Sequence, residues 1–267
     1  MKNLISLLVF LTFYLGCEAS LIDTLSVKSK FLNSIENVVV ISPEISKEKS
    51  CPTVYLLNGH TGNHLSWMNI RQDLPELADK YGIIFVMPDG KNSWYWDSPV
   101  DSTMRMESFI TMDLVPIIDS KYNTIPNPEK RAISGLSMGG HGAMWLALRH
   151  PELWKNVGST SGGLDIRPFP ENWDMKYRLG DKNENEELWD NHTVINLIPD
   201  VTKDYYNIII DCGTEDFFFE VNNAVHDSLL EHNIKHDYIV RPGGHTIDYW
   251  SNSILYHLLF FSENFKE

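Results

Sequence analysis

Gly135-Leu136-Ser137-Met138-Gly139 is a G-x-S-x-G stretch that occurs once in the chain, and its surroundings decide the fold. The apolar run 131–134 before it predicts the end of a strand, and the run 143–148 after it predicts a helix. A strand that turns into a helix within one or two residues strains the backbone at the turn and lifts that side chain clear of the sheet. We therefore expect Ser137 to be a nucleophile at a helix N-terminus, where backbone N–H groups favour developing negative charge.

Strands and helices are predicted to alternate on both sides of this turn. The leading pair of strands is antiparallel, and the later strands each precede a helix. We expect strands at 21–28, 34–41, 54–57, 83–86, 157–160, 207–211 and 238–241, and helices at 74–80, 106–117, 221–232 and 247–260, with Pro116 bending the second helix. This order predicts an α/β fold with a mostly parallel sheet, helices on both faces and functional residues at the carboxyl ends of the strands. No large separate cap domain is expected.

One stretch breaks the alternation. Residues 162–203 hold prolines, glycines and a charged run at 181–190, which predict an irregular excursion with short helices. Its place after a predicted core strand makes it a candidate rim for a substrate site.

Length and charge limit the classes of protein that this chain can represent. At 267 residues and 43% hydrophobic, it fits a single domain, which we place at 20–267. Its formal net charge of −14 argues against nucleic acid or an anionic membrane surface as partner.

The first residues read as a targeting segment. A basic start and an apolar run from Leu4 to Leu15, too short to span a bilayer, predict a signal peptide over 1–19. The run ends in Gly16-Cys17, which resembles a lipobox, so both lipid anchoring at Cys17 and ordinary cleavage near Ala19 stay open. Either outcome predicts an exported protein that is periplasmic, secreted or held at the cell envelope by its lipid. That lipid is the one membrane attachment we expect.

We expect the two remaining cysteines, Cys51 and Cys212, to be free thiols. Cys51 precedes one predicted parallel strand and Cys212 follows another, so they should lie at opposite ends of the sheet, beyond disulfide reach. No CxxC, HExxH or calcium-loop motif occurs, so no metal site is predicted.

A serine nucleophile needs a histidine base held by a carboxylate. Of the ten histidines, His245 follows the last predicted strand across Pro242-Gly243-Gly244, in a loop at the strand-end edge. The carboxylate is expected in the loop after the preceding strand, where Asp216 is favoured because it lies nearest the next helix. Asp211 and Glu215 remain alternatives, and Asp211 could instead brace the loop through backbone N–H groups. The order Ser, Asp, His is that of α/β-hydrolases.

Two backbone donors are expected to hold an oxyanion. One is the N–H of Met138, directly after the serine, and the other is the N–H of His60, in the loop after a buried strand.

Five stretches together resemble the "Putative esterase" family, which includes tributyrin, feruloyl and acetyl xylan esterases, S-formylglutathione hydrolases, enterobactin esterases and mycolyltransferases. They are 135–140, 58–63, 92–95, 147–151 and 211–216, and the similarity runs from about Ser34 to Phe260. The resemblance implies a serine carboxylesterase of the α/β-hydrolase superfamily that uses Ser137, Asp216 and His245 without a cofactor. Within the family, residues 92–95 look most like the tributyrin and carbohydrate esterases.

Three tryptophans near strand ends are candidate substrate contacts: Trp94, Trp96 and Trp250. Their flat apolar faces suit a sugar ring or an aryl acyl group, although core packing would also explain them. With export, they favour short acyl or feruloyl esters on polysaccharide as the substrate. The alternatives are an acyltransferase of the mycolyltransferase type and a noncatalytic carbohydrate-binding protein on the same scaffold.

Overall fold

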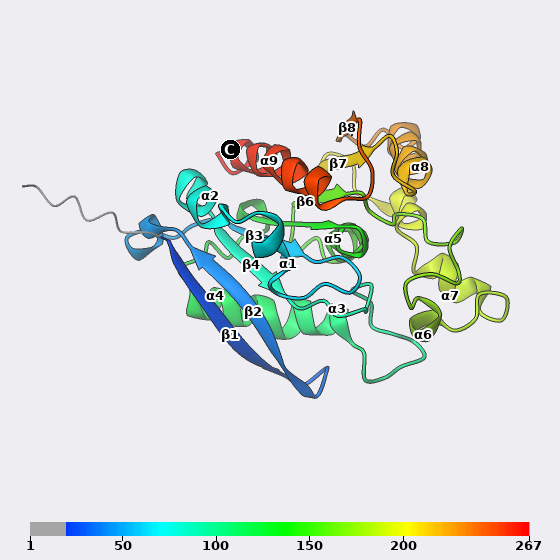
Figure 1. The fold of residues 1–267 in the computed structure, drawn as a ribbon, viewed down its shortest axis with the longest axis horizontal. Coiled ribbons are helices and arrows are strands. Elements are labelled where there is room, and N and C mark those ends of the chain that lie inside the picture. The colour runs from blue at the N-terminus through cyan, green and yellow to red at the C-terminus, as the bar shows by residue number, and fades with distance from the viewer. Residues whose placement is uncertain (1–19, 267) are drawn as a thin grey trace, which may run out of the picture.

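The computed structural model describes residues 20–266, and one mixed sheet runs through that part of the chain (Figure 1). The strands lie in the order β1-β2-β4-β3-β5-β6-β7-β8. Their bounds are β1 Leu21–Ser29, β2 Ser34–Ser42, β3 Thr53–Leu57, β4 Ile84–Pro88, β5 Arg131–Leu136, β6 Asn156–Thr160, β7 Asn207–Gly213 and β8 Asp237–Arg241. β1 pairs antiparallel with β2, and β2 pairs antiparallel with β4. All other neighbours are parallel, which confirms the predicted α/β class.

Burial along the strands explains why β3 and β4 are almost entirely apolar. Every residue of β3, β4, β5 and β6 is buried, because helices cover both faces of the sheet there. The edge strand β1 instead alternates between exposed and buried residues over its second half. Period-two alternation is the pattern of a strand with one wet face.

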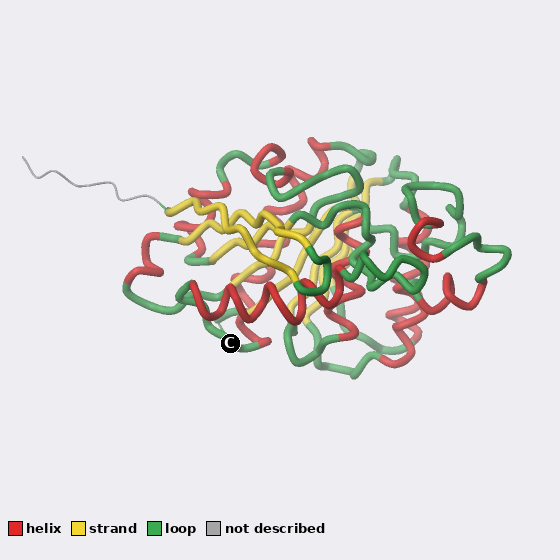
Figure 2. Tube along the Cα trace, turned by 90° about the horizontal axis from the view of Figure 1, so that it is seen from below, coloured by secondary structure: helices red, strands yellow, loops and turns green. Residues whose placement is uncertain are grey.

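Helices lie on both sides of the strands (Figure 2). Trp67 of α1, Leu77 of α2 and Leu258 of α9 pack against one face, whereas Met106 of α3, Met144 of α5 and Val225 of α8 belong to the core on the other. The bounds are α1 Ser66–Ile70, α2 Leu74–Tyr81, α3 Met106–Ser108, α4 Val115–Lys121, α5 Met138–Arg149, α6 Lys176–Leu179, α7 Glu186–Asn191, α8 Phe219–Glu231 and α9 Ile247–Asn264. Single 3₁₀ segments are η1 Glu44–Lys47, η3 Pro128–Lys130 and η4 Val194–Asp200.

The helix predicted at 106–117 is divided rather than simply bent. A π-helical segment, η2 (Phe109–Leu114), separates α3 from α4, and Pro116 lies in the first turn of α4. Proline cannot donate a backbone hydrogen bond and crowds the carbonyl four residues before it, and the wider π turn accommodates both effects. Helix α1 was not predicted, because a five-residue helix gives too little periodicity.

The excursion at 162–203 is irregular, as predicted, with α6, α7 and η4 as its short helices. In Figure 1, α6 and α7 lie at the opposite side of the molecule from β1 and β2. No separate cap domain is present among residues 20–266.

The signal peptide, the lipobox at Cys17 and cleavage near Ala19 lie outside the described residues. Cys51 and Cys212 are buried free thiols. None of the helices described at 20–266 has the length and the apolar composition of a membrane span. In the same residues, no three His, Cys, Asp or Glu side chains are grouped so that they could hold a metal ion.

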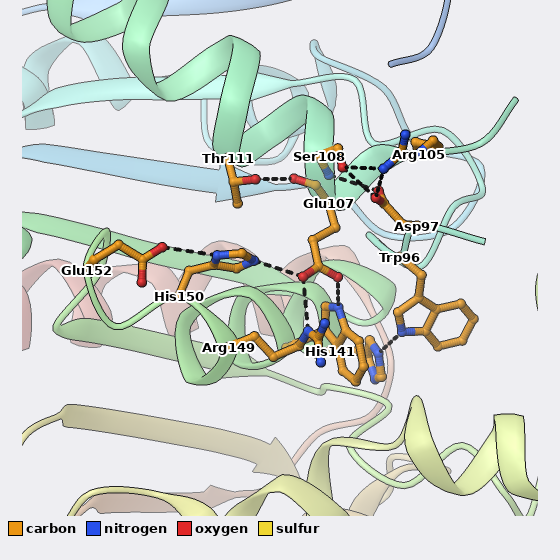
Figure 3. A network of polar contacts seen from close by, with 11 residues as sticks. Trp96, Asp97, Arg105, Glu107, Ser108, Thr111, His141, Arg149, His150 and Glu152 are labelled. Carbon is orange, nitrogen blue, oxygen red and sulfur yellow. Dashed lines mark hydrogen bonds and ion pairs between the residues drawn. The ribbon is translucent and has the colours of Figure 1, made fainter. Parts of the chain in front are cut away.

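A buried carboxylate ties α3 to α5 (Figure 3). Glu107 accepts hydrogen bonds from Trp145 Nε1 at 2.8 Å, Arg149 Nε at 3.0 Å and His150 Nε2 at 2.8 Å. Burial alone would raise the pKa of Glu107, but these donors outweigh it and hold the pKa below its usual value. Because α5 begins directly after Ser137, this cluster fixes the far end of the helix that carries the serine.

The same cluster predicts a pH-dependent contribution to stability. Burial would lower the pKa of His150, but its contacts with Glu107 and with Glu152 outweigh burial and raise the pKa. A group with a raised pKa stabilises the fold fully below its unfolded value and loses that contribution as pH rises through its folded value. The difference in unfolding free energy between wild type and His150→Gln should therefore be largest below about pH 6.5 and shrink as pH rises. Urea unfolding across a pH series measures it, and a constant difference would contradict the role of His150.

Candidate active site

Ser137 occupies a strained turn between β5 and α5. Its backbone lies at φ 55° and ψ −119°, a left-handed conformation that non-glycine residues seldom adopt. The turn is tight because β5 and α5 approach closely. A Cβ on Gly135 would lie 2.3 Å from the Gly139 carbonyl oxygen, and one on Gly139 would lie 2.3 Å from the Leu57 carbonyl oxygen. Both glycines of the motif are therefore required sterically.

The structure brings Ser137, His245 and Asp216 into one hydrogen-bonded chain. Ser137 Oγ lies 2.9 Å from His245 Nε2, and His245 Nδ1 lies 2.9 Å and 3.1 Å from the two carboxylate oxygens of Asp216. Since a carboxylate only accepts, the imidazole donates from Nδ1 and leaves Nε2 to accept from the serine hydroxyl. The Asp216 side chain is fully buried, and that of His245 is 16% exposed. The hydroxyl thus has an acceptor for its proton, oriented by a buried carboxylate.

Backbone bonds between two loops set this geometry. In the turn after β7, the N–H of Thr214 donates to the Arg241 carbonyl and the N–H of Glu215 donates to the Gly243 carbonyl. These bonds hold the loop of Asp216 against the loop of His245. One oxygen of Asp216 also accepts from the Phe218 N–H at 2.9 Å, which fixes the side-chain rotamer.

The two alternative carboxylates lie elsewhere. Glu215 is exposed. Asp211 is buried. It accepts from side chains rather than from loop N–H groups, which were the predicted alternative: His257 Nε2 at 2.7 Å, Thr160 Oγ1 at 2.9 Å and Ser253 Oγ. Burial would raise the pKa of Asp211, but these donors outweigh burial and lower it. Asp211 therefore anchors α9 to the strands beneath the site.

His141, four residues after the serine, is a core residue. Its Nδ1 donates to the Gly163 carbonyl at 2.9 Å, and its Nε2 accepts from Trp96 Nε1 at 2.9 Å. Burial, only partly offset by the Gly163 carbonyl, lowers the pKa of His141 to about 3. The ring is accordingly neutral and structural.

The loop after β3 lies beside the serine. Gly59, His60 and Thr61 line the same cavity as Ser137. Among the described residues no acceptor pairs with the His60 N–H, whereas the Thr61 N–H donates to Asn92 Oδ1 at 2.9 Å. Met138 is the first residue of α5, where N–H groups have no partner within the helix. Both predicted donors are thus available.

A cavity of about 510 Å³ opens at this point. It lies within the ~300–1,000 Å³ range of small-molecule sites. Its walls combine the serine and histidine with polar loop residues and a larger apolar share: Gly59, His60, Thr61, Gly62, Ser66, Asn69, Ile70, Leu136, Ser137, Trp173, Phe217, His245, Ile247 and Trp250. The exposed side chains of Phe217 and Ile247 form an apolar rim.

Two of the three candidate tryptophans do not reach the cavity. Trp94 and Trp96 are 1% and 0% exposed and belong to the core. The reason is the left-handed backbone at Trp94 and Tyr95, which folds the loop inward. Trp94 Nε1 donates to the Trp173 carbonyl and Trp96 Nε1 donates to His141 Nε2, so both indole N–H groups are satisfied inside the core. The assignment of Trp94 and Trp96 to substrate is therefore corrected to core packing, whereas Trp250 does line the cavity and lies edge-on to His245.

Trp173 and Phe217 also line the cavity, and neither was predicted from the sequence as an individual wall residue. Trp173 comes from the excursion at 162–203 and lines the cavity. Phe217 directly follows Asp216, and the centroid of its ring lies 4.2 Å from the centroid of the His245 ring. The sequence feature that could have indicated Phe217 is its position next to Asp216, a candidate catalytic residue.

The family of the chain follows from its similarity to known proteins. The model of the "Putative esterase" family matches residues 29–261. The chain belongs to that family. This esterase is 26% identical over 252 residues to an acetyl esterase of Caldicellulosiruptor saccharolyticus, with 85% of this chain and 92% of the relative aligned. It is 24% identical over 212 residues to the S-formylglutathione hydrolase of Bos taurus, with 72% and 73% aligned.

Solved structures agree on the fold of the esterase. A ferulic acid esterase superposes with a TM-score of 0.80 at 25% identity, over 92% of this chain and 98% of the other. The S-formylglutathione hydrolase FrmB of Staphylococcus aureus superposes with a TM-score of 0.81 at 19% identity, over 91% and 99%. The fold is that of the α/β-hydrolases, and the protein is a carboxylic ester hydrolase.

Proposed function

We propose that this protein is a serine carboxylesterase that removes short acyl or feruloyl groups from carbohydrate esters. The observation that carries the proposal is the hydrogen-bonded chain Ser137–His245–Asp216, which opens into an aromatic cavity of about 510 Å³. The similarity to an acetyl esterase and to a ferulic acid esterase supports the choice of acyl group.

The proposed reaction begins with proton transfer. His245 Nε2 takes the proton of the Ser137 hydroxyl, 2.9 Å away, as Oγ attacks the ester carbonyl carbon. Asp216 holds the imidazole in the tautomer that can accept this proton and stabilises the imidazolium that results. The carbonyl oxygen, now negative, is held by the N–H groups of His60 and Met138, each worth about 3 kcal/mol on the scale of a well-studied protease.

Collapse of the tetrahedral intermediate releases the alcohol. His245 returns its proton to the leaving alkoxide oxygen, and the acyl group stays on Ser137 as an ester. Water then attacks that ester with His245 again as base, which frees the acid and restores the serine. No step in this scheme requires a cofactor.

The cavity walls support a small acyl or aryl acid. Trp173, Phe217 and Trp250 offer flat apolar faces around the serine, and such faces suit an aromatic acid or the apolar face of a sugar. The exposed rim leaves room for the alcohol side of a larger substrate to remain outside.

A substrate panel tests the proposal. Wild type and Ser137→Ala are compared on p-nitrophenyl acetate and butyrate, acetylated xylan and methyl ferulate. Serine-dependent release of acetate from xylan or of ferulate supports the carbohydrate assignment. Activity on the simple esters alone would contradict that assignment, and a sugar acceptor that becomes acylated would point to transfer instead of hydrolysis. Folded wild type without serine-dependent turnover would defeat the proposal.

Export remains part of the proposal, supported by the basic and apolar start of the sequence. Mass spectrometry of the protein from its native host tests it, since residues 1–16 should be absent. Their presence would contradict export by this signal.

A further inference from the structure

Asp174, in the excursion at 162–203, bonds to the loop that carries the proposed oxyanion donor, the His60 N–H. Asp174 Oδ2 lies 3.1 Å from His60 Nε2 and accepts from Asn92 Nδ2 at 3.0 Å. Asn92 in turn accepts the Thr61 N–H through its Oδ1 at 2.9 Å. The carboxylate therefore holds the His60 ring directly, and through Asn92 it holds the next backbone amide.

The turn that presents this carboxylate is itself fixed. Trp173 and Asp174 have φ values of 49° and 61°. In this region the backbone of a residue other than glycine is strained, and the conformation persists only if its surroundings hold it. The Trp173 carbonyl accepts from Trp94 Nε1 at 2.9 Å. The Trp173 ring stacks on the Phe217 ring, with the ring centroids 5.3 Å apart and the planes at 21° to each other. The turn is thus bound to the core on one side and to the cavity wall on the other.

We propose that Asp174 is a positioning residue that sets the His60 N–H for the oxyanion. The inference rests on the proposed function. An oxyanion donor must lie about 2.7–3.1 Å from the place that the oxygen takes in the intermediate, so a small displacement of the loop removes much of its effect. Thr61 is exposed and His60 is only partly buried, and among the described residues the His60 ring has Asp174 as its hydrogen-bond partner. We call the contacts of Asp174 with His60 and Asn92 the Asp174 clamp. The clamp supplies the rigidity that this donor needs.

If Asp174 and His60 formed only an ordinary surface ion pair, the loss of that pair would leave kcat unchanged. The side chains of Asp174 and His60 are 40% and 18% exposed. A pair that only ties two loops together contributes little, and its loss would leave turnover unchanged. The kinetic constants separate the two roles, because an oxyanion donor acts on the transition state and affects kcat rather than KM.

The variants are Asp174→Ala and Asp174→Asn, assayed on p-nitrophenyl acetate. We expect alanine to lower kcat about ten-fold, part of the effect of losing one oxyanion donor, with KM changed less than about two-fold. Asparagine should retain most of the activity, because its carboxamide oxygen can still accept from His60 and Asn92 and because asparagine tolerates left-handed φ. Hydrogen exchange of the segment 58–65 should accelerate in the alanine variant only.

The matched control is Asp204→Ala. Asp204 also has a left-handed φ, 58°, and also forms an ion pair, 2.7 Å from Lys235 Nζ, at an exposed site. It reproduces the backbone strain and the lost ion pair without the contact to His60, so its kcat should equal that of wild type. In a His60→Ala background, the loss caused by Asp174→Ala should shrink, because part of the clamp is already absent.

The positioning role is overturned if Asp174→Ala keeps kcat within two-fold of wild type, or if asparagine falls as far as alanine. Either result, with serine-dependent turnover intact in wild type, leaves the esterase proposal standing. Wild type without serine-dependent turnover would instead defeat both proposals.

Discussion

Replacing Ser137 with alanine is expected to lower the turnover of p-nitrophenyl acetate by about a million-fold, on the scale of a dissected protease triad. The proposed mechanism passes the acyl group through Ser137 Oγ, and no covalent intermediate forms without that oxygen. The fold should survive, because the Ser137 side chain is partly exposed and its hydrogen bond is to the His245 side chain. Steady-state kinetics of purified protein, with a thermal melt for folding, measures both effects.

A distant serine provides the control for this variant. Ser120→Ala removes a hydroxyl that bonds to the Ile117 carbonyl on the exposed side of α4, and it should leave turnover unchanged. Labelling by a fluorophosphonate should be lost in Ser137→Ala alone. Turnover within ten-fold of wild type in a folded Ser137→Ala protein would remove the serine from its proposed role.

Replacing Asp216 with asparagine should lower kcat by about ten-thousand-fold, as for the equivalent change in a well-studied protease. The new carboxamide would present its N–H groups to His245 Nδ1 and favour the tautomer with a proton on Nε2. That tautomer cannot accept from the Ser137 hydroxyl. The pH dependence of kcat/KM and the single-turnover rate of acylation measure the loss.

The two alternative carboxylates, Asp211 in β7 and Glu215 in the loop after it, serve as matched controls. Glu215→Gln, at the exposed neighbouring position, should keep kcat within about two-fold. Asp211→Asn should instead lower the thermal midpoint, because it disturbs a buried carboxylate that holds His257. If Asp211→Asn lost activity while Asp216→Asn kept it, the assignment of the carboxylate would be reversed.

The Glu107 cluster and the Asp174 clamp act on different parts of the site. Glu107 secures the C-terminal end of the helix that follows Ser137, where it bonds to Arg149 and His150. Asp174 secures the facing loop through His60. The serine and the proposed oxyanion donor are therefore each supported by a polar contact from a segment distant in sequence.

The sequence by itself determined the fold class and the turn at Ser137. Both depend on local pattern: apolar runs of strand length, helical periodicity and glycines where β5 meets α5. The sequence also brought His245 into consideration through chain order, because a loop after a parallel strand must emerge at the same edge as the serine.

Only the tertiary structure decided which nearby residues face the site. Asp211 and Asp216 lie five positions apart, and the bonds between two loops decided that Asp216 meets the histidine. The left-handed backbone at Trp94 turned that ring into the core and left Trp173 at the cavity wall. Composition cannot show such choices, because they depend on backbone turns and on contacts between segments far apart in the chain. The contact of Asp174 with His60, 114 residues apart, belongs to the same class.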